Sequence, residues 1–244
     1  MLRSERDGQV HVLTIDRAER RNAIDHATIL ELLDAQDAIR AAGSDVRAVV
    51  LTGAPPAFSA GADLTGVEQG VFATDLSRML RGFGGLPVPV IASIDGPALG
   101  AGMQLAVAVD LRVATADSVL GVPAAKLGLA VDHWTIRRVI AELTMPVARS
   151  MLLVAETLTG DELHRAGAVH RLGGLDVAVD WAHRIAQLAP MTMATHKLGL
   201  ESAAASLAVD EEFERAFAAT WASDDQVEGK AAFLEKRRPE FRGT

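Results

Sequence analysis

Residues 95–110 read DGPALGAGMQLAVAVD, a glycine-rich turn followed directly by an apolar helix. Glycines at such a junction let another chain segment or a ligand come close to the backbone. The apolar run predicts a buried helix, yet an amide, Gln104, stands near its start. The preceding stretch, Pro89–Gly96, is short, β-branched and bounded by turn residues, which is typical of a strand. Strand, turn and buried helix in this order indicate an α/β core.

The chain on either side of this segment supports the same fold class. A helix is predicted over His26–Gly43, where Ile29, Leu32, Leu33 and Ile39 recur at helical spacing and Gly43 is a stop signal. Strands are predicted over four further stretches on the same grounds as Pro89–Gly96. They are Val10–Asp16, Arg47–Gly53, Leu111–Thr115 and Ser118–Pro123.

The last third of the chain is predicted to be mainly helical, because strand signals fade from about Pro146. An amphipathic helix is expected over Leu175–Ala189, ended by Pro190, and further helices over 209–223 and 224–238. Capping boxes are indicated by the pairs Thr159/Glu162 and Ser223/Gln226. We therefore expect an α/β core over residues 1–189 and a helical C-terminal region over 190–244.

Composition narrows the classes of function. The chain of 244 residues has a net charge of −8, which argues against nucleic acid as a partner. It contains no cysteine, and its seven histidines show no close metal-ligand spacing, so no metal site is predicted. The N-terminus lacks the apolar segment of a signal peptide, and no apolar run is long enough to span a bilayer. These features predict a cytoplasmic protein that does not insert into membranes.

Two turns rich in small residues are the main candidates for a site. They are AFSAGADL, residues 57–64, and GPALGAGMQL, residues 96–105, and each follows a predicted strand. Small side chains leave backbone N–H groups uncovered, and two such groups aimed at one point form an oxyanion hole. Either turn taken alone fits a tight packing turn equally well.

Taken together, the motifs support a family assignment. RAERRNAI, AFSAGADL, GPALGAGMQLAVAVDLRVAT, GLAVDHWTIRR and AAFLEKRRPEF occur in the order and spacing of the crotonase, or enoyl-CoA hydratase/isomerase, superfamily, and the chain resembles that family over essentially its whole length. The resemblance implies a spiral of ββα units followed by helices used in trimerisation. It also implies a homo-oligomer, either a trimer or a dimer of trimers.

The resemblance also assigns roles to residues. It implies that the N–H groups of Ala60 and Ala101 bind the thioester oxygen of an acyl-CoA, and that no other cofactor is needed. Basic residues suit the CoA phosphates, with Lys236–Arg238 at one end and Arg20 and Arg21 at the other. The implied CoA contacts are Arg21, Ala23, Ala60, Gly61, Ala62, Asp63, Leu64, Phe233 and Lys236.

Two residues depart from the pattern of the family's hydratases, which use two glutamates. Gln104 and Ala124 stand at those positions, as in the actinobacterial, mycobacterial-type members that this chain closely resembles. An amide does not exchange a proton near neutral pH, and an alanine carries no polar atom. Asp132 matches the place of an aspartate in some isomerases of the family, but it also suits an N-cap for a helix starting at His133.

Two functions follow from these residues. The first is an enoyl-CoA hydratase/isomerase homologue that binds fatty acyl-CoA without hydrating it and passes the acyl chain to another enzyme, such as one of fatty-acid synthesis. The second is an active hydratase or isomerase with an acid–base set rearranged around Asp132.

Overall fold

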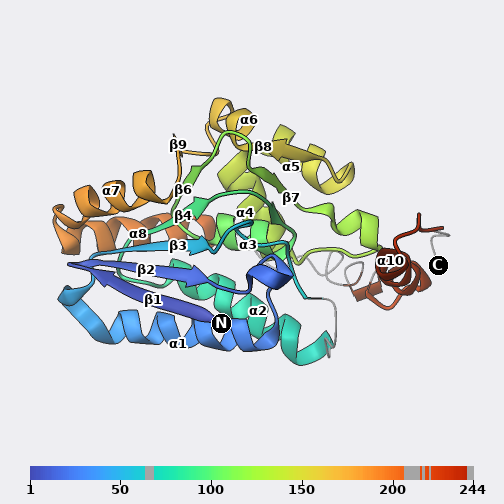
Figure 1. Cartoon of the computed structure of the whole chain (residues 1–244), viewed down its shortest axis with the longest axis horizontal. Helices are drawn as coiled ribbons and strands as arrows, with labels where there is room; N and C mark the ends of the chain where they lie inside the picture. Colours follow the sequence, from blue (N-terminus) through green and yellow to red (C-terminus); the bar gives the residue numbers. More distant parts are fainter. Residues whose placement is uncertain (64–68, 206–214, 216–217, 220, 241–244) are drawn as a thin grey trace.

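The computed structural model, which describes residues 1–63, 69–205, 215, 218–219 and 221–240, confirms the α/β class (Figure 1). The larger of two sheets has the strand order β1-β2-β3-β4-β6-β9. All neighbours in it are parallel except β1, which is antiparallel to β2. Its strands are β1 (Leu2–Asp7), β2 (Val10–Ile15), β3 (Ala48–Gly53), β4 (Val90–Ile94), β6 (Leu111–Ala114) and β9 (Arg171–Leu172).

The central strands are buried on both faces, as expected for parallel strands covered by helices on each side. In β3, Val49 and Leu51 belong to the main core, whereas Ala48 and Val50 face the opposite way. The helix α7 (Leu175–Ala186) covers this second face with small side chains such as Ala178 and Ala182. Alternation along the strand thus produces two apolar layers from one run of hydrophobic residues.

The main core is closed by helices from both halves of the chain. They include α1 (His26–Ala42), α2 (Gln69–Gly84), α3 (Ala101–Ala108), α4 (His133–Leu143) and α5 (Met145–Leu153). Short helical turns are η1 (Ala18–Arg20), η2 (Gly43–Asp45) and η3 (Pro123–Leu127), and α6 (Gly160–Arg165) begins at the predicted Thr159/Glu162 capping box, which is present.

A second sheet of three strands was only partly predicted. It contains β5 (Ala98–Leu99), β7 (Val119–Gly121) and β8 (Thr157–Thr159), with β7 between the other two. The expectation that strands end near Pro146 is wrong for β8 and β9. These strands are two or three residues long, which is too short for an alternating pattern to be visible in the sequence.

The glycine-rich composition of residues 82–87, GFGGLP, suggests a loop. In the structure, however, α2 continues to Gly84. A Cβ added at Gly82 would lie 2.0 Å from the Gln36 side-chain oxygen on α1. Phe83 is fully buried in the main core. Close packing of α1 against α2 thus accounts for the glycine and outweighs its poor helix propensity.

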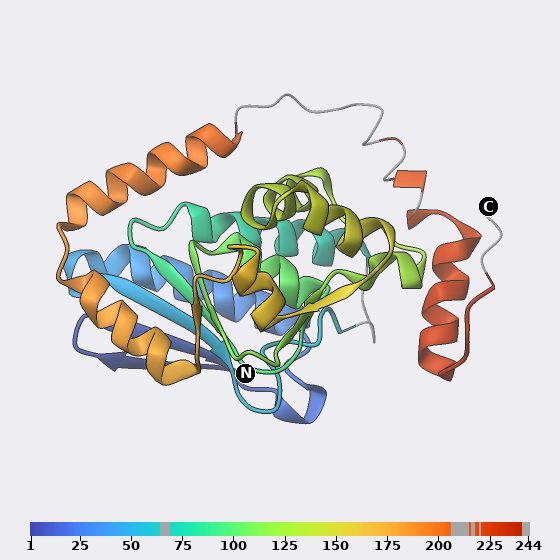
Figure 2. The ribbon, with the colours of Figure 1, turned by 90° about the horizontal axis from the view of Figure 1, so that it is seen from above.

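The C-terminal region contains two described helices, α8 (Pro190–Ala205) and α10 (Asp224–Glu235), which lie at opposite ends of the molecule (Figures 1 and 2). The first turn of α8 contains Pro190, while α7 already ends at Ala186. On α8, the buried Lys197 ammonium lies 2.7 Å from Asp110 and donates to the Val88 carbonyl oxygen. Most of the helix predicted over 209–223 lies outside the described residues.

Buried arginines tie the C-terminal region to the core. Arg112 on β6 is 1% exposed and donates to carbonyl oxygens at the end of α3 and to Glu142 on α4. Arg138 on α4 donates to the Val107 carbonyl oxygen of α3 and pairs with Glu142 and with Glu201 of α8. Burial lowers the pKa of Arg112, and the carboxylate of Glu142 opposes that shift. These two guanidinium groups therefore hold α3, α4 and α8 in one arrangement.

Asn22 connects two loops at the carboxyl end of β3. It is fully buried, its φ is 55°, and its amide nitrogen donates to the carbonyl oxygens of Ala54 and Ala57 at 2.7 and 2.6 Å. Its side-chain oxygen accepts from the Arg17 N–H at 2.9 Å. One side chain thereby satisfies three backbone groups that water does not reach.

Replacing Asn22 should destabilise the protein strongly. We expect Asn22→Gly, which tolerates the left-handed backbone, to lower the free energy of unfolding by about 2–3 kcal/mol through the lost hydrogen bonds. Asn22→Ala should cost about 1 kcal/mol more, because alanine is strained at positive φ. Urea unfolding of the two variants measures the contributions of the hydrogen bonds and of the backbone conformation to the free energy of unfolding. Equal losses of this free energy in the two variants would show that the backbone conformation contributes nothing.

Candidate functional site

The two turns rich in small residues lie against each other at the start of α3. Ser59 N–H donates to the Pro97 carbonyl oxygen, and Leu99 N–H donates back to the Ser59 carbonyl oxygen. A Cβ added at Gly102 would lie 2.4 Å from the Ser59 carbonyl oxygen, and one at Gly61 would lie 2.9 Å from that of Leu99. The glycines at these two positions therefore permit a backbone-to-backbone contact that any side chain would prevent.

The free N–H groups differ from those that the sequence indicated. The Ala60 N–H donates to the Arg21 carbonyl oxygen at 3.0 Å, so it is already used within the chain. The N–H groups of Ala62 and Ala101 make no hydrogen bond in the described part of the chain. Ala101 is the first residue of α3, where N–H groups have no partner within the helix. Of the expected pair, the Ala101 N–H is therefore free and the Ala60 N–H is not, while a free N–H of the first turn belongs to Ala62.

Gln104 and Ala124 lie in two different elements next to the two turns. Gln104 lies in the first turn of α3, three residues after Ala101. Ala124 lies in η3, and the strand before it is held to the site because the Gly100 N–H donates to the Gly121 carbonyl oxygen at 2.9 Å. Both residues are partly buried. Neither carries an ionisable group, so these two positions cannot transfer protons.

Asp132 caps α4. Its carboxylate accepts from the Thr135 N–H at 2.9 Å and lies 3.7 Å from Arg81 of α2. The indole of Trp134 lies close to two guanidinium groups, those of Arg81 at 5.7 Å and Arg138 at 6.0 Å. One oxygen of Asp132 thus caps the helix and the other lies near the Arg81 guanidinium, which agrees with the helix-cap interpretation.

The loop that carries Arg21 and Ala23 adjoins the first turn through ion pairs. Asp63 is 8% exposed and lies 3.3 Å from Arg17 and 3.4 Å from Arg20, so part of the basic cluster at 20–21 is neutralised within the chain. Although burial opposes it, hydrogen bonds from Thr28 and the charge of Arg17 lower the pKa of Asp25. Arg21 itself is exposed, and Leu64 lies outside the described residues.

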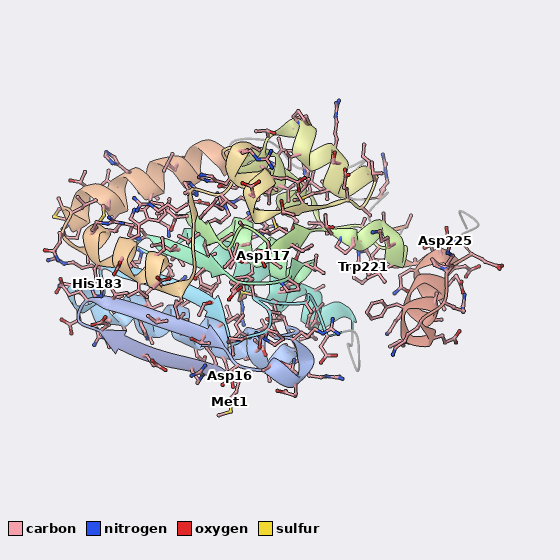
Figure 3. All side chains as sticks on the ribbon, turned by 45° about the horizontal axis from the view of Figure 1, so that its top comes forward. Met1, Asp16, Asp117, His183, Trp221 and Asp225 are labelled. Atoms are coloured by element: carbon pink, nitrogen blue, oxygen red, sulfur yellow. The ribbon has the colours of Figure 1, made fainter. Side chains whose placement is uncertain are left out.

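The C-terminal basic cluster is placed by α10, which packs against η3. A Cβ at Gly229 of α10 would lie 2.3 Å from the Leu127 carbonyl oxygen, and Trp221, just before α10, donates to the Ala130 carbonyl oxygen at 3.1 Å (Figure 3). Phe233 and Lys236 are exposed. Arg237, in contrast, is paired with Glu228 and Glu235. Only part of the predicted phosphate-binding cluster is therefore open to an anion.

No group of His, Cys, Asp and Glu side chains among the described residues is arranged to hold a metal ion. Within the same ranges, no helix combines the length and the apolar character needed to cross a membrane.

The chain is similar to known proteins over almost its whole length. The sequence profile of the enoyl-CoA hydratase/isomerase family matches residues 5–244. The "Probable enoyl-CoA hydratase echA6" of Mycobacterium tuberculosis is 41% identical over 239 residues, which cover 95% of this chain and 96% of that protein. Carnitinyl-CoA hydratase from Mycobacterium avium is 29% identical with a TM-score of 0.83, covering 100% of this chain and 98% of the other.

A third comparison bears on the fold alone. Methylmalonyl-CoA decarboxylase in complex with 2S-carboxypropyl-CoA is 23% identical with a TM-score of 0.91, covering 100% of this chain and 98% of the other. The architecture is thus the crotonase fold, an α/β class of proteins. The chain belongs to the enoyl-CoA hydratase/isomerase family.

Two residues that support the site were not predicted from the sequence. Asn22 lies in the quoted motif RAERRNAI, but one sequence does not show that its amide bonds to a loop more than thirty residues away. Arg17 was also missed, although it joins Asp25 to Asp63. The available signal was an asparagine in a short polar turn, a residue type that adopts positive φ more often than most.

A substitution at Gly102 should separate the two turns. We expect Gly102→Ala to lower the free energy of unfolding by about 1–3 kcal/mol, because the new methyl group overlaps a backbone oxygen of Ser59. Gly199→Ala is the matched control, since Gly199 lies in α8 with no atom within 4 Å of an added Cβ. That control should be neutral or stabilising by up to about 1 kcal/mol. Thermal unfolding compares the two variants with the wild type. If Gly102→Ala were as stable as Gly199→Ala, the close contact between the two turns would be contradicted.

Proposed function

We propose that this protein binds fatty acyl-CoA thioesters, with the thioester oxygen between the N–H groups of Ala62 and Ala101, and that it does not hydrate enoyl-CoA. The observation that carries the proposal is the juxtaposition of two turns, one with the free N–H of Ala62 and the other with the free N–H of Ala101 at the start of the buried helix α3. The positive end of the α3 dipole adds to the attraction for a partly negative oxygen. Membership of the enoyl-CoA hydratase/isomerase family supports a CoA thioester as the ligand.

The residue types at positions 104 and 124 support the second part of the proposal. Hydration adds water across a double bond, which requires a base to activate the water and an acid to protonate the neighbouring carbon. Gln104 and Ala124 supply neither. The contacts of Asp132 with Thr135 and Arg81 give no support to an acid–base set built around it. The protein would thus bind its ligand and leave the acyl group unchanged.

Two further parts of the proposal concern partners. We propose a carrier role in fatty-acid metabolism, because a protein that binds an acyl-CoA without converting it must release it to an enzyme. We also propose a homo-oligomer, because α8 exposes large apolar side chains to water. They include Met191 at 84%, Leu198 at 71% and Leu200 at 71% exposure.

Removing one N–H group tests the binding site. Ala101→Pro deletes the amide hydrogen at the first position of α3, where proline is well tolerated in helices. We expect acyl-CoA affinity to fall about tenfold, the worth of one hydrogen bond in a desolvated site. Calorimetric titration with acyl-CoAs of short, medium and long chain measures this, with thermal unfolding as the check on folding. If the folded wild-type protein binds none of them, the proposal fails.

A second measurement addresses hydration. We expect the wild-type protein to hydrate crotonyl-CoA at least ~10²-fold more slowly than a typical hydratase, because general acid–base catalysis contributes about that factor or more. Gln104→Glu together with Ala124→Glu is the minimum needed for a gain, and each single variant should stay inactive because the two groups act as a unit. Asp132→Asn, which keeps a helix-capping side chain, is the control. Ordinary hydratase turnover by the wild type that is lost in Asp132→Asn would contradict the proposal.

A further inference from the structure

One residue of α3 is not enclosed by the rest of the fold. Seven of the eight residues of this helix are buried, and the exception is Gln104. The helix is therefore accessible at a single side chain, on the turn that also carries the free N–H of Ala101. The accessible point and the proposed thioester site are thus adjacent on the same element.

Among the described residues, none pairs with the side-chain amide of Gln104. In the ranges that the structure describes, its backbone N–H donates to the Gly100 carbonyl oxygen, but its side-chain amide makes no hydrogen bond. A partly buried amide without a partner costs free energy when a ligand excludes water from it. A ligand that pairs with this group is thus favoured over one that covers it with methylene groups.

Helix geometry places this amide near the acyl carbons. Side chains on a helix lean toward its N-terminus, and residues three apart are neighbours with Cβ atoms about 5–6 Å apart. The amide of Gln104 therefore extends back over the turn that begins at Ala101. With the thioester oxygen bound at the Ala101 N–H, the third acyl carbon, two bonds beyond the carbonyl carbon, falls within reach of a glutamine side chain.

Three described residues already assigned to the site do not pair with the Gln104 amide. Ala124 has no polar side-chain atom, the Asp132 carboxylate is held by Thr135 and Arg81, and the Ser59 hydroxyl accepts from the Gly61 N–H at 3.3 Å. A glutamine amide donates two hydrogen bonds and accepts at its oxygen, whereas a glutamate only accepts. The replacement of a carboxylate by an amide thus creates a donor where the family's hydratases have none.

We infer that Gln104 selects acyl-CoA ligands that carry an oxygen on the third acyl carbon, namely 3-oxoacyl-CoA and 3-hydroxyacyl-CoA, over saturated acyl-CoA of the same length. A keto oxygen accepts from the amide N–H, and a hydroxyl group either accepts from it or donates to the amide oxygen. The inference rests on the proposed function and specifies the ligand class of the same site.

The experiment compares three types of ligand, each at two chain lengths, on three proteins. Hexanoyl-CoA, 3-hydroxyhexanoyl-CoA and 3-oxohexanoyl-CoA, and the corresponding twelve-carbon set, are titrated calorimetrically into the wild type, Gln104→Met and Gln104→Glu at pH 7.5. We expect the wild type to bind both oxygenated ligands about fivefold more tightly than the saturated one, the worth of one net hydrogen bond. Gln104→Met, which has a similar shape and no N–H, should bind all three alike.

Gln104→Glu separates the two oxygenated ligands. A carboxylate accepts from a hydroxyl group but repels a keto oxygen, so this variant should keep the preference for 3-hydroxyacyl-CoA and bind 3-oxoacyl-CoA no better than the saturated ligand. Equal affinities in the wild type, or an unchanged preference in Gln104→Met, would overturn the inference. If saturated acyl-CoA binds with no preference, only this inference fails, whereas no binding of any ligand removes the proposed function as well.

Discussion

The direct contact between two backbone segments, residues 59–62 and 98–102, is the constraint on which the candidate site depends. No side chain separates them, and the added Cβ distances of 2.4 Å at Gly102 and 2.9 Å at Gly61 show that none would fit. Backbone atoms and small residues form this contact, so the positions of the Ala62 and Ala101 N–H groups do not depend on the side chains of Gln104 and Ala124. The proposed oxyanion donors and the proton-transfer positions are thus separate parts of the structure.

The rest of the fold supports this contact from both sides. Asn22 holds the loop after β3 against the turn before α1, so the first segment is fixed by a buried amide. Arg112 and Arg138 bind carbonyl groups at the far end of α3, so the second segment is fixed through its helix. Buried charges of this kind add little net stability, but breaking one pair leaves the other charge unsatisfied. The ion pairs of Arg112 and Arg138 therefore fix the relative positions of α3, α4 and α8, while they add little to the free energy of unfolding.

The proposed site lacks ionisable groups at two positions, 104 and 124, where the resemblance implies glutamates in the family's hydratases. The proposed oxyanion donors come from the backbone, while proton transfer would depend on Gln104 and Ala124, which cannot supply it. In the proposed function, ligand binding and proton transfer are thus assigned to different atoms of one scaffold. The inferred role of Gln104 adds a hydrogen-bond donor near the acyl chain.

The sequence by itself determined the α/β class, most of the central strands, α1, and the two turns that form the site, because each of these depends on local periodicity or on glycine. It also determined that Gln104 and Ala124 lack carboxylates, since residue identity settles that point. Tertiary structure decided which N–H groups are free, because Ala60 donates to Arg21, a residue far from it in the chain. Tertiary structure also decided that Gly82–Gly84 form the end of a helix, because α2 packs closely against α1. The short segments β8 and β9 are strands because they pair with neighbouring strands. Long-range hydrogen bonds and close packing are properties of the folded chain, and a local pattern does not contain them.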